Sequence, residues 1–251
     1  MKSAILITAR LKSTRLPMKV IKPIQGRPMI GHMLDRLKLA RRPSEIIICT
    51  SPLTQDDPLV EIAHQEGVQC YRGDPDDVLL RLTKAAEQFG VDVVISCTAD
   101  NPFVDPESID RLVDYHLEQG FDFTRMEGLP FGTFSYAISY PAMVKACELK
   151  AEKDTEVWGG YFTETGQFKW GVMPLDDPAL RWPKLRLTVD TPEDFELVSR
   201  IFDELYEGGH VFPLRDIVAL CRRRPDLVAI NASVQQKAGL AIKTKLERTD
   251  A

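Results

Sequence analysis

Four cationic side chains lie within one short stretch near the N-terminus, ITARLKSTRLPMK: Arg10, Lys12, Arg15 and Lys19. No acidic residue balances them there, although the whole chain carries a net charge of −5. Arginine presents a planar fork of donors to phosphate oxygens, and lysine presents a point charge. The stretch follows an apolar run and precedes an expected helix, so turn amides aided by a helix N-terminus can form an anion nest. The pattern predicts binding of a small, highly charged anion such as a nucleoside triphosphate.

The spacing of this loop excludes two common phosphate-binding motifs. It lacks the GxxxxGK[ST] pattern of a P-loop, and it lacks the GxGxxG pattern of dinucleotide-binding folds. A solvated basic turn without a ligand remains the alternative, because basic turns are common on protein surfaces.

Two aspartates follow expected strands and are candidates for holding a metal ion. Asp100 follows VVISCTA, and Asp190 follows RLTV. Ligands of parallel sheets bind beyond the carboxyl ends of the strands, so we expect the two carboxylates to meet there. Mg²⁺ usually takes one or two protein carboxylates together with phosphates and water. Alternatively, Asp100 forms a turn before Asn101 and Pro102, and Asp190 caps a helix, although Thr191 already suits that position.

Composition places the chain among ordinary soluble globular proteins and argues against several other classes. It has 251 residues, of which 44% are apolar and 27% are charged. No apolar run approaches the roughly 20 residues of a membrane span, and the N-terminal run is too short for a signal peptide. Five scattered cysteines without metal-binding spacing predict a reducing, cytoplasmic location. A pI near 5.5 argues against bulk binding to nucleic acid.

Strands and helices alternate over the first 120 residues, as the hydrophobic periodicity indicates. Strands are expected at residues 3–8, 45–50, within 67–73 and at 92–98, and helices at 29–40, 59–66, 77–89 and 106–119. This order predicts a mostly parallel sheet flanked by helices. The later chain is expected to hold strands within FDFT, GLPFGTFSYAIS, GQFKWGVMPL and KLRLTVD, a helix at 141–150, and a helix that begins after Thr191. We expect one mixed α/β domain over residues 1–228 and a C-terminal extension over 229–251.

Three further acids are interpreted as turn or helix-start residues: Asp92, Asp105 and Asp194.

The combined motifs resemble one family, the cytidylyltransferases that make CMP-activated sugar acids. The stretch ARLKSTRLPMKVIKPIQGRPMIGHMLDRLK is similar to the N-terminal signature of the CMP-Kdo and CMP-sialate synthetases, and above all to the spore-coat polysaccharide biosynthesis branch. The resemblance continues through YRGDPDDVLLRLTKAA, CTADNPFVDPESIDRLV and LRLTVDTPEDFELVSRIFDEL. It covers most of residues 1–206 and is weak between 121 and 184.

The resemblance implies a fold and an activity. The expected fold is a single Rossmann-like nucleotidyltransferase domain of the GT-A-like type, in a homodimer. The expected reaction uses CTP to activate a sugar acid or a related small acceptor as a CMP-linked product. Pyrophosphate is released, and the product serves surface polysaccharide or glycoconjugate synthesis.

The resemblance also implies roles for individual residues. Arg10, Arg15 and Lys19 are the expected catalytic residues, because they would stabilise charge on the α-phosphate and on the departing pyrophosphate. Asp100 and Asp190 match the metal ligands, with Mg²⁺ as the cofactor. The expected nucleotide-binding residues are Ala9, Arg10, Ser13, Thr14, Arg15, Lys19, Arg72, Asp77, Arg81 and Thr98. For Arg72, Asp77 and Arg81, a solvated helix start with an aspartate cap is an equally good interpretation.

Two positions of the loop depart from the family pattern. Lys12 stands where small residues are usual, and Met18 stands where glycine is usual. Glycine permits a close approach of the backbone to phosphate, so we expect the loop to be reshaped at these positions. Relatives of the sialate type tolerate a larger residue at the position of Met18, so we do not expect it to inactivate the protein.

The acceptor is expected to contact residues 121–161, where the resemblance is weak. The acid expected from the spore-coat branch falls near Ser135 or Tyr136, and the expected histidine is replaced around Val157. Glu127 and Glu156 are the polar candidates for acceptor contacts. Five aromatic residues either wall an acceptor pocket or, as we favour, make core or dimer contacts: Phe131, Phe134, Tyr136, Trp158 and Tyr161.

Two other functions stay open. A glycosyltransferase of related topology would need an Asp-x-Asp metal site, and Asp74 and Asp76 offer one, although before a helix rather than after a long strand. A non-catalytic nucleotide-binding relative would fit the missing acceptor motifs, whereas Asp100, Asp190 and Lys19 count against it. No histidine lies in a triad-like setting. Buried strands are expected around both Cys49 and Cys97, which argues against activated thiols.

Overall fold

The centre of the chain is a twisted sheet covered by helices. The computed structural model describes residues 1–155, 157–236 and 241–245, and within this part the sheet has seven strands in the order β5-β4-β1-β6-β8-β7-β9. Their bounds are Ser3–Thr8 for β1, Ile46–Thr50 for β4, Gln69–Arg72 for β5, Val93–Thr98 for β6, Phe123–Met126 for β7, Tyr136–Ser139 for β8 and Trp170–Met173 for β9. Strand β8 runs antiparallel to β6 and β7, and the other adjacent pairs are parallel. The predicted mostly parallel sheet is confirmed.

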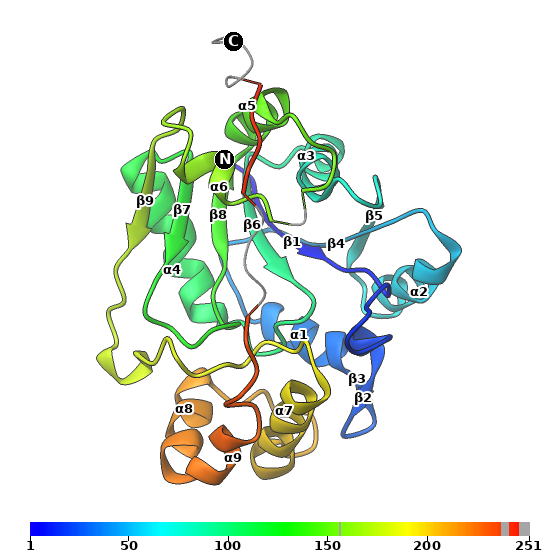
Figure 1. Cartoon of the computed structure of the whole chain (residues 1–251), viewed down its shortest axis with the longest axis vertical. Coiled ribbons are helices and arrows are strands. Elements are labelled where there is room, and N and C mark those ends of the chain that lie inside the picture. Colours follow the sequence, from blue (N-terminus) through cyan, green and yellow to red (C-terminus); the bar gives the residue numbers. More distant parts are fainter. Residues whose placement is uncertain (156, 237–240, 246–251) are drawn as a thin grey trace.

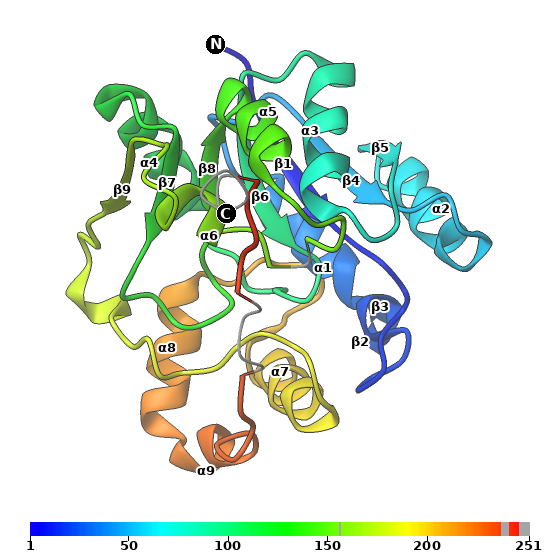
Figure 2. The same ribbon diagram turned by 45° about the horizontal axis from the view of Figure 1, so that its top comes forward.

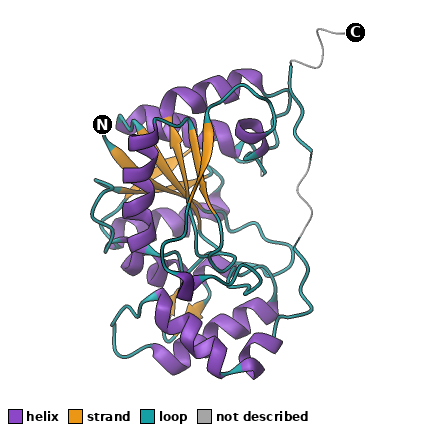
Figure 3. Cartoon of the chain, turned by 90° about the vertical axis from the view of Figure 1, so that its left-hand side faces the viewer, coloured by secondary structure: helices purple, strands orange, loops and turns teal. Residues whose placement is uncertain are grey.

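Helices cover both faces of this sheet, and a further group lies beyond one end of it (Figures 1 and 3). The helices are α1 (Met29–Leu37), α2 (Asp57–Gln65), α3 (Val78–Phe89), α4 (Pro106–Gln119), α5 (Tyr140–Leu149), α6 (Gly160–Thr163), α7 (Pro192–Leu205), α8 (Leu214–Arg223) and α9 (Pro225–Ala229). Side chains of β1 alternate between two cores, since Ile5 and Ile7 pack with α1, α2 and α4, whereas Ala4 and Leu6 pack with α3, α5 and α6. The expected α/β architecture follows from strands that are buried on both faces.

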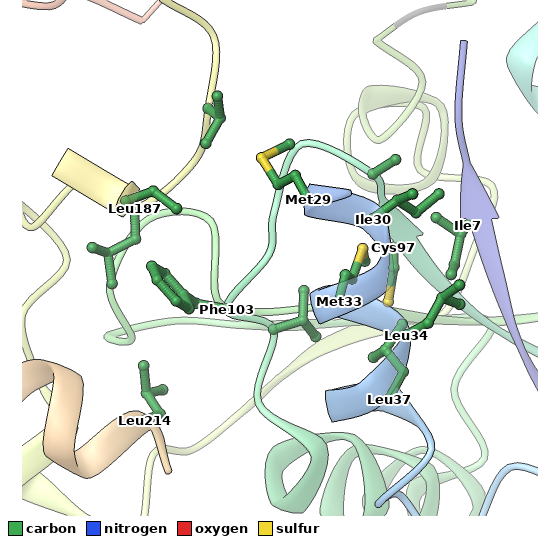
Figure 4. Packing of buried hydrophobic residues seen from close by; sticks show 14 of the residues in the cluster. Ile7, Met29, Ile30, Met33, Leu34, Leu37, Cys97, Phe103, Leu187 and Leu214 are labelled. Carbon is green, nitrogen blue, oxygen red and sulfur yellow. The ribbon is translucent and has the colours of Figure 1, made fainter. Parts of the chain in front are cut away.

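The larger core continues from the sheet to the helices near the C-terminus. Figure 4 shows Phe103 between the side chains of α1 and those of Leu187 and Leu214. All three side chains are almost fully buried, and the same apolar cluster extends into α7 and α8. Helices α7, α8 and α9 lie together in Figure 2, and buried residues of all three belong to the same apolar cluster as one face of the sheet.

The segment KLRLTVD differs from its predicted strand structure. Leu185, Leu187 and Val189 are buried as expected, but the segment makes a single parallel bridge, between Phe131 and Arg186, and is not a strand of the sheet. Its backbone bonds go to loops instead: the Leu187 amide donates to the Phe131 carbonyl over 2.8 Å. The alternation of apolar residues in this segment therefore results from packing against the core and not from pairing in the sheet. Asp190 consequently reaches its position from a loop, and the expectation that it follows a sheet strand is wrong.

Glycine at position 132 permits the close approach of these two loops. Its φ is +93°, and a Cβ built there would lie 2.5 Å from the Thr188 nitrogen. Real Cβ atoms do not approach backbone so closely, so only glycine fits without moving the Thr188 segment.

The first part of the C-terminal extension returns across the molecule from α9 towards α5 (Figure 1). Thr244 bridges Lys150, and the Lys245 amide donates to the Leu149 carbonyl over 2.9 Å. The predicted division at residue 228 stays a prediction, while the described part of the extension is hydrogen-bonded to the domain.

Helix starts and buried thiols agree with the sequence analysis. Thr191 and Asp194 form a capping box at the start of α7. Cys49 and Cys97 are fully buried in strands, and burial raises the pKa of Cys97 to about 12, so the thiol stays protonated. Within the described part of the chain, no helix is both long enough and apolar enough to cross a membrane.

Candidate active site

The cationic loop is fixed between the ends of β1 and β4. The Ala9 amide donates to the Cys49 carbonyl over 3.2 Å, and the Leu11 amide donates to Asp56 Oδ1 over 2.8 Å. Inside the loop, the hydroxyl of Ser13 accepts from the Leu16 amide over 3.4 Å. The backbone path is therefore set by the neighbouring strand and by the turn after it.

No α-helix starts directly after this loop. A 3₁₀ turn, Lys19–Ile21, comes first, followed by a hairpin of β2 (Pro23–Ile24) and β3 (Arg27–Pro28), and α1 begins only at Met29. The expectation that a helix N-terminus directly supports the loop is wrong. The loop offers its own amides and its cationic side chains.

Lys19 joins the two candidate metal ligands. Its Nζ donates to Asp100 Oδ2 over 3.2 Å and to Asp190 Oδ1 over 2.9 Å, and also to the carbonyl of Val189 over 2.7 Å. The guanidinium of Arg15 lies 3.1 Å from the same Asp190 oxygen. Two carboxylates that are 90 residues apart in the sequence thus meet two cations of the loop. The two aspartates meet at this edge of the sheet, as expected, whereas their pairing with Lys19 was not predicted from the sequence.

These contacts fix the charge of each group. Burial by itself would lower the pKa of Lys19, but the carboxylates of Asp100 and Asp190 outweigh it and raise that pKa. Burial would raise the pKa of Asp190, but Lys19, Arg15 and Arg186 outweigh it and lower that pKa. At neutral pH the Lys19 ammonium and the Asp190 carboxylate therefore lie side by side in their charged forms.

The side chain of Arg10 belongs to a second cluster, which lies at the turn before α3. It donates to the carbonyl of Pro75 and lies 3.3 Å from Asp76. Arg81 is only 1% exposed and donates to the carbonyls of Asp74 and Pro75 over 2.5 Å and 3.3 Å. Burial, followed by the nearby charge of Arg10, lowers the pKa of Arg81. Arg10 thus holds the GDPDD turn against the cationic loop, and Arg81 holds the same turn against α3.

Asp77 and Arg72 make contacts of a structural kind. Asp77 caps α3 by accepting from the Leu80 amide over 3.0 Å, and it pairs with the ammonium of Lys150. It is buried, so the cap is not solvated. Arg72 donates to the carbonyls of Ser51 and Leu53. Neither side chain contacts the Lys19 cluster.

The remaining predicted nucleotide-binding residues lie at the same edge of the sheet. Thr14 is exposed on the cationic loop, and Thr98 is exposed at the end of β6. The hydroxyl of Thr98 accepts from the side-chain Nδ2 of Asn101 over 2.7 Å, and Thr98 pairs in register with Thr8. The ends of β1 and β6 therefore place Thr98 beside the start of the loop.

The donor set of the site fits a magnesium ion that is shared with phosphates. Asp100 and Asp190 supply hard carboxylate oxygens that already face a cation, the Lys19 ammonium. Among the residues that the structure describes, no group of three metal-binding side chains occurs. Mg²⁺ commonly takes one or two carboxylates and completes its shell with phosphate and water. These residues therefore fit the ion together with a triphosphate and do not form an all-protein cage.

The Asp-x-Asp pair of the glycosyltransferase alternative lacks such an arrangement. Asp74 Oδ1 accepts from the amides of Asp76 and Asp77, each over 2.9 Å, so Asp74 forms the turn before α3. Asp76 faces Arg10. The structure gives no support to a metal site there.

Two residues near Asp190, Arg186 and Asn231, were missed from the sequence, and a third, Asp194, was assigned only to a helix start. Arg186 pairs with both Asp190 and Asp194, and Asn231 donates to Asp194 over 2.8 Å. Asp194 does begin a helix, but its carboxylate is also completely buried and paired. The spacing of Arg186 and the two acids at intervals of four residues was the available signal. Nothing in the sequence indicated Asn231.

The expected acceptor segment divides into core and surface. Trp158 and Tyr161 are buried in the core under α5, which confirms the core interpretation for these two. Phe131 instead packs its ring 5.6 Å from the Arg186 guanidinium. Glu127 pairs with Arg125 over 2.6 Å, and Glu156 lies outside the described residues.

The sheet and the charges at its carboxyl edge define an α/β nucleotidyltransferase. Comparisons with known proteins agree. Residues 4–157 match the model of the family described as Cytidylyltransferase. An uncharacterised protein of Methanocaldococcus jannaschii is 31% identical over 93% of this chain and 96% of its own. The spore coat polysaccharide biosynthesis protein SpsF of Bacillus subtilis is 29% identical over 88% of this chain and 94% of its own.

A solved structure supports the same conclusion. A cytidylyltransferase from Leptospira borgpetersenii superposes with a TM-score of 0.83 at 27% identity, covering 95% of this chain and all of the other. The chain therefore belongs to the cytidylyltransferase family, as the motif resemblance predicted, and it is an enzyme of the nucleotidyltransferase class.

The backbone at Met18 explains why glycine is usual at that position. Met18 has φ +57° and ψ 19°, in the left-handed region, and its side chain is 41% exposed. Lys12 is exposed, and nothing in the described structure explains its presence.

Replacing Met18 should therefore relieve backbone strain. We expect Met18→Gly to be more stable than the matched control Met18→Ala by about 1 kcal/mol, because a left-handed non-glycine residue costs about 1–2 kcal/mol and glycine returns part of this as chain entropy. Urea unfolding of both variants measures the difference. Equal stability of the two variants would contradict the strain.

The charge of Lys19 should control the acid stability of the chain. The pKa of Asp190 is lowered in the folded chain, so its stabilising contribution is present at neutral pH and disappears as the pH falls through that lowered pKa. We expect Lys19→Met to raise the pKa of Asp190 and to move this loss to higher pH. Unfolding midpoints in urea between about pH 2 and about pH 6 measure the shift. Lys12→Met, on the exposed part of the same loop, is the control, and identical profiles for the two variants would refute the coupling.

Proposed function

We propose that this cytidylyltransferase transfers CMP from CTP to an oxygen of a small acceptor, with Mg²⁺ as its cofactor and pyrophosphate as the second product. The observation that carries the proposal is the meeting of Asp100 and Asp190 at the ammonium of Lys19, beside Arg15. Two carboxylates for a metal and two cations for phosphate oxygens are the groups that such a transfer requires.

The chemistry assigned to the residues is electrostatic. An acceptor oxygen attacks the α-phosphorus, the bond from that phosphorus to the bridging oxygen breaks, and pyrophosphate leaves with the electron pair. Arg15 and Lys19 neutralise the charge that develops on the departing pyrophosphate. Asp100 and Asp190 would hold Mg²⁺ together with the triphosphate, and the ion would supply further neutralisation of the phosphate charge. The acceptor proton passes to solvent, and no covalent enzyme intermediate is needed.

Arg10 has a different place in the proposal. Its side chain contacts the turn at Pro75 and Asp76 and does not contact Asp100 or Asp190. We therefore assign it to the nucleotide side of the loop. Arg81, from α3, donates to a carbonyl of the same turn. Arg72 and Asp77 are proposed to support nucleotide binding indirectly, by stabilising the turns that they contact.

A sugar acid is the acceptor class that we favour. The motifs around Lys19, Asp100 and Asp190 resemble synthetases that activate sugar acids, and a similar protein is named for spore coat polysaccharide biosynthesis. A role in surface polysaccharide or glycoconjugate synthesis follows from this. The predicted homodimer and cytoplasmic location stay predictions.

A pyrophosphate-release assay tests the proposal. The purified chain is incubated with each of the four nucleoside triphosphates, Mg²⁺ and a panel of sugar acids and neutral sugars. We expect release with CTP and a sugar acid, and much less release with the other three nucleotides, with neutral sugars or after chelation of the metal. Tight CTP binding without release for any acceptor would instead favour a non-catalytic nucleotide-binding protein.

Asp190→Asn tests the assigned metal ligand. The substitution keeps the size of the side chain and removes its charge, and we expect turnover with Mg²⁺ to fall by at least about a hundredfold, since loss of an outer-shell partner alone costs about 10–100-fold. The control is Asp226→Asn, which removes a carboxylate that an arginine outside the site holds over 2.8 Å. Circular dichroism shows whether both variants remain folded. Turnover unchanged in Asp190→Asn would remove this residue from the site.

A further inference from the structure

We propose that Arg186 is a positioning residue for Asp190, and that the start of the C-terminal extension belongs to the reaction site because it holds Arg186. The inference rests on the proposed function, since it assigns a role towards the metal ligand Asp190. It concerns the orientation of this carboxylate rather than contact with the nucleotide.

The two oxygens of Asp190 have different partners. Oδ1 faces Arg15 and Lys19, and Oδ2 accepts from Arg186 Nη2 over 2.9 Å. The Asp190 amide also donates to Asp194 Oδ2 over 3.0 Å. Because Arg186 occupies Oδ2, rotation of the carboxylate is restricted and Oδ1 stays directed at the loop. A metal ligand that is held by a hydrogen bond from outside its own shell binds the ion in a fixed geometry.

Arg186 is itself held rigidly. Its Nε and Nη2 donate to the two oxygens of Asp194, over 2.8 Å and 2.9 Å, as a planar guanidinium fork allows. The Asp194 carboxylate is completely buried and caps α7, so it cannot follow a moving arginine. The ring of Phe131 covers one face of the guanidinium. The arginine is therefore fixed on both sides, and Asp190 receives a donor whose position is set before any ligand binds.

The C-terminal extension completes this arrangement. Asn231, which is 3% exposed, donates from one Nδ2 to Asp194 Oδ1 over 2.8 Å and to the Arg186 carbonyl over 3.1 Å. Gln236 accepts from Arg186 Nη1 over 2.6 Å. Asn231 and Gln236 therefore hold the backbone and the side chain of Arg186, although they lie 45 and 50 residues further along the chain.

Later residues of the extension are also bound to the domain. The Ala151 amide donates to the Lys243 carbonyl over 2.9 Å, and the Tyr161 hydroxyl donates to the same carbonyl over 3.2 Å. Lys245 donates from its Nζ to the Glu148 carbonyl over 2.7 Å. The extension is thus hydrogen-bonded to the domain on both sides of residues 237–240.

Binding of Mn²⁺ to full-length variants in the presence of CTP tests the inference. The electron paramagnetic resonance signal of free Mn²⁺ reports binding without any need for turnover. We expect Arg186→Met to weaken Mn²⁺ binding by about tenfold or more, the size of effect that outer-shell partners of metal ligands show. Arg186→Lys should recover only part of the loss, because lysine cannot reproduce the two-pronged contact. Gln236→Ala should weaken binding by a smaller factor.

The matched control is Arg224→Met. Arg224 also joins two carboxylates, Glu204 over 2.7 Å and Asp226 over 2.8 Å, but it does not contact Asp190. We expect wild-type Mn²⁺ binding in this variant. Melting temperatures of all variants separate a loss of fold from a loss of metal binding. In folded Arg186→Met, a higher Mn²⁺ concentration should restore turnover towards the wild-type kcat, which a general structural defect would not allow.

Two results would overturn the inference. The first is that the Arg186→Met variant folds and binds Mn²⁺ as tightly as the wild type. If this variant does not fold, Asn231→Ala and Gln236→Ala decide, and unchanged Mn²⁺ binding in both refutes the role of the extension. Failure of the proposed function appears elsewhere, as a wild-type chain that binds CTP and Mn²⁺ but releases no pyrophosphate.

Discussion

The ammonium of Lys19 between the carboxylates of Asp100 and Asp190 is the interaction on which the candidate site depends. Two carboxylates brought this close would repel each other, and burial would favour protonation of Asp190. A single cation removes both difficulties and links three segments that are distant in sequence: the loop after β1, the end of β6 and the loop that precedes α7. The parallel sheet supplies the geometry, because the carboxyl ends of β1 and β6 lie side by side.

Around this cluster, charged groups are arranged in two layers. Arg15 and Lys19 face the side where the nucleotide is proposed to bind, whereas Arg186 approaches Asp190 from the side of α7 and the extension. A separate pair of arginines, Arg10 and Arg81, holds the turn before α3. The chain has an acidic net charge, yet Arg15, Lys19 and Arg186 gather around the carboxylate of Asp190.

Much of the fold and the centre of the site could be predicted from the sequence, because both follow from local patterns. The alternation of apolar strands and amphipathic helices fixed the parallel sheet, and the residues after β1 and β6 then had to share one edge. The segment around Leu187 was mistaken for a strand because burial against a core gives the same alternation as pairing in a sheet. Asn231 escaped notice because its contacts depend on how distant segments pack, which no local pattern records. Arg186 was overlooked although its spacing to Asp190 and Asp194 was a local signal.

The position of Asn231 has a consequence for how the protein matures in the cell. A chain leaves the ribosome from its N-terminus, and domains fold as their residues become available. The loop after β1, Asp100 and Asp190 emerge well before Asn231 and Gln236. The partly synthesised chain can therefore build its sheet and bring Lys19 to both aspartates while the arginine behind Asp190 still lacks its last partners. The hydrogen bonds around Arg186 become complete only after residues 231–236 have been synthesised.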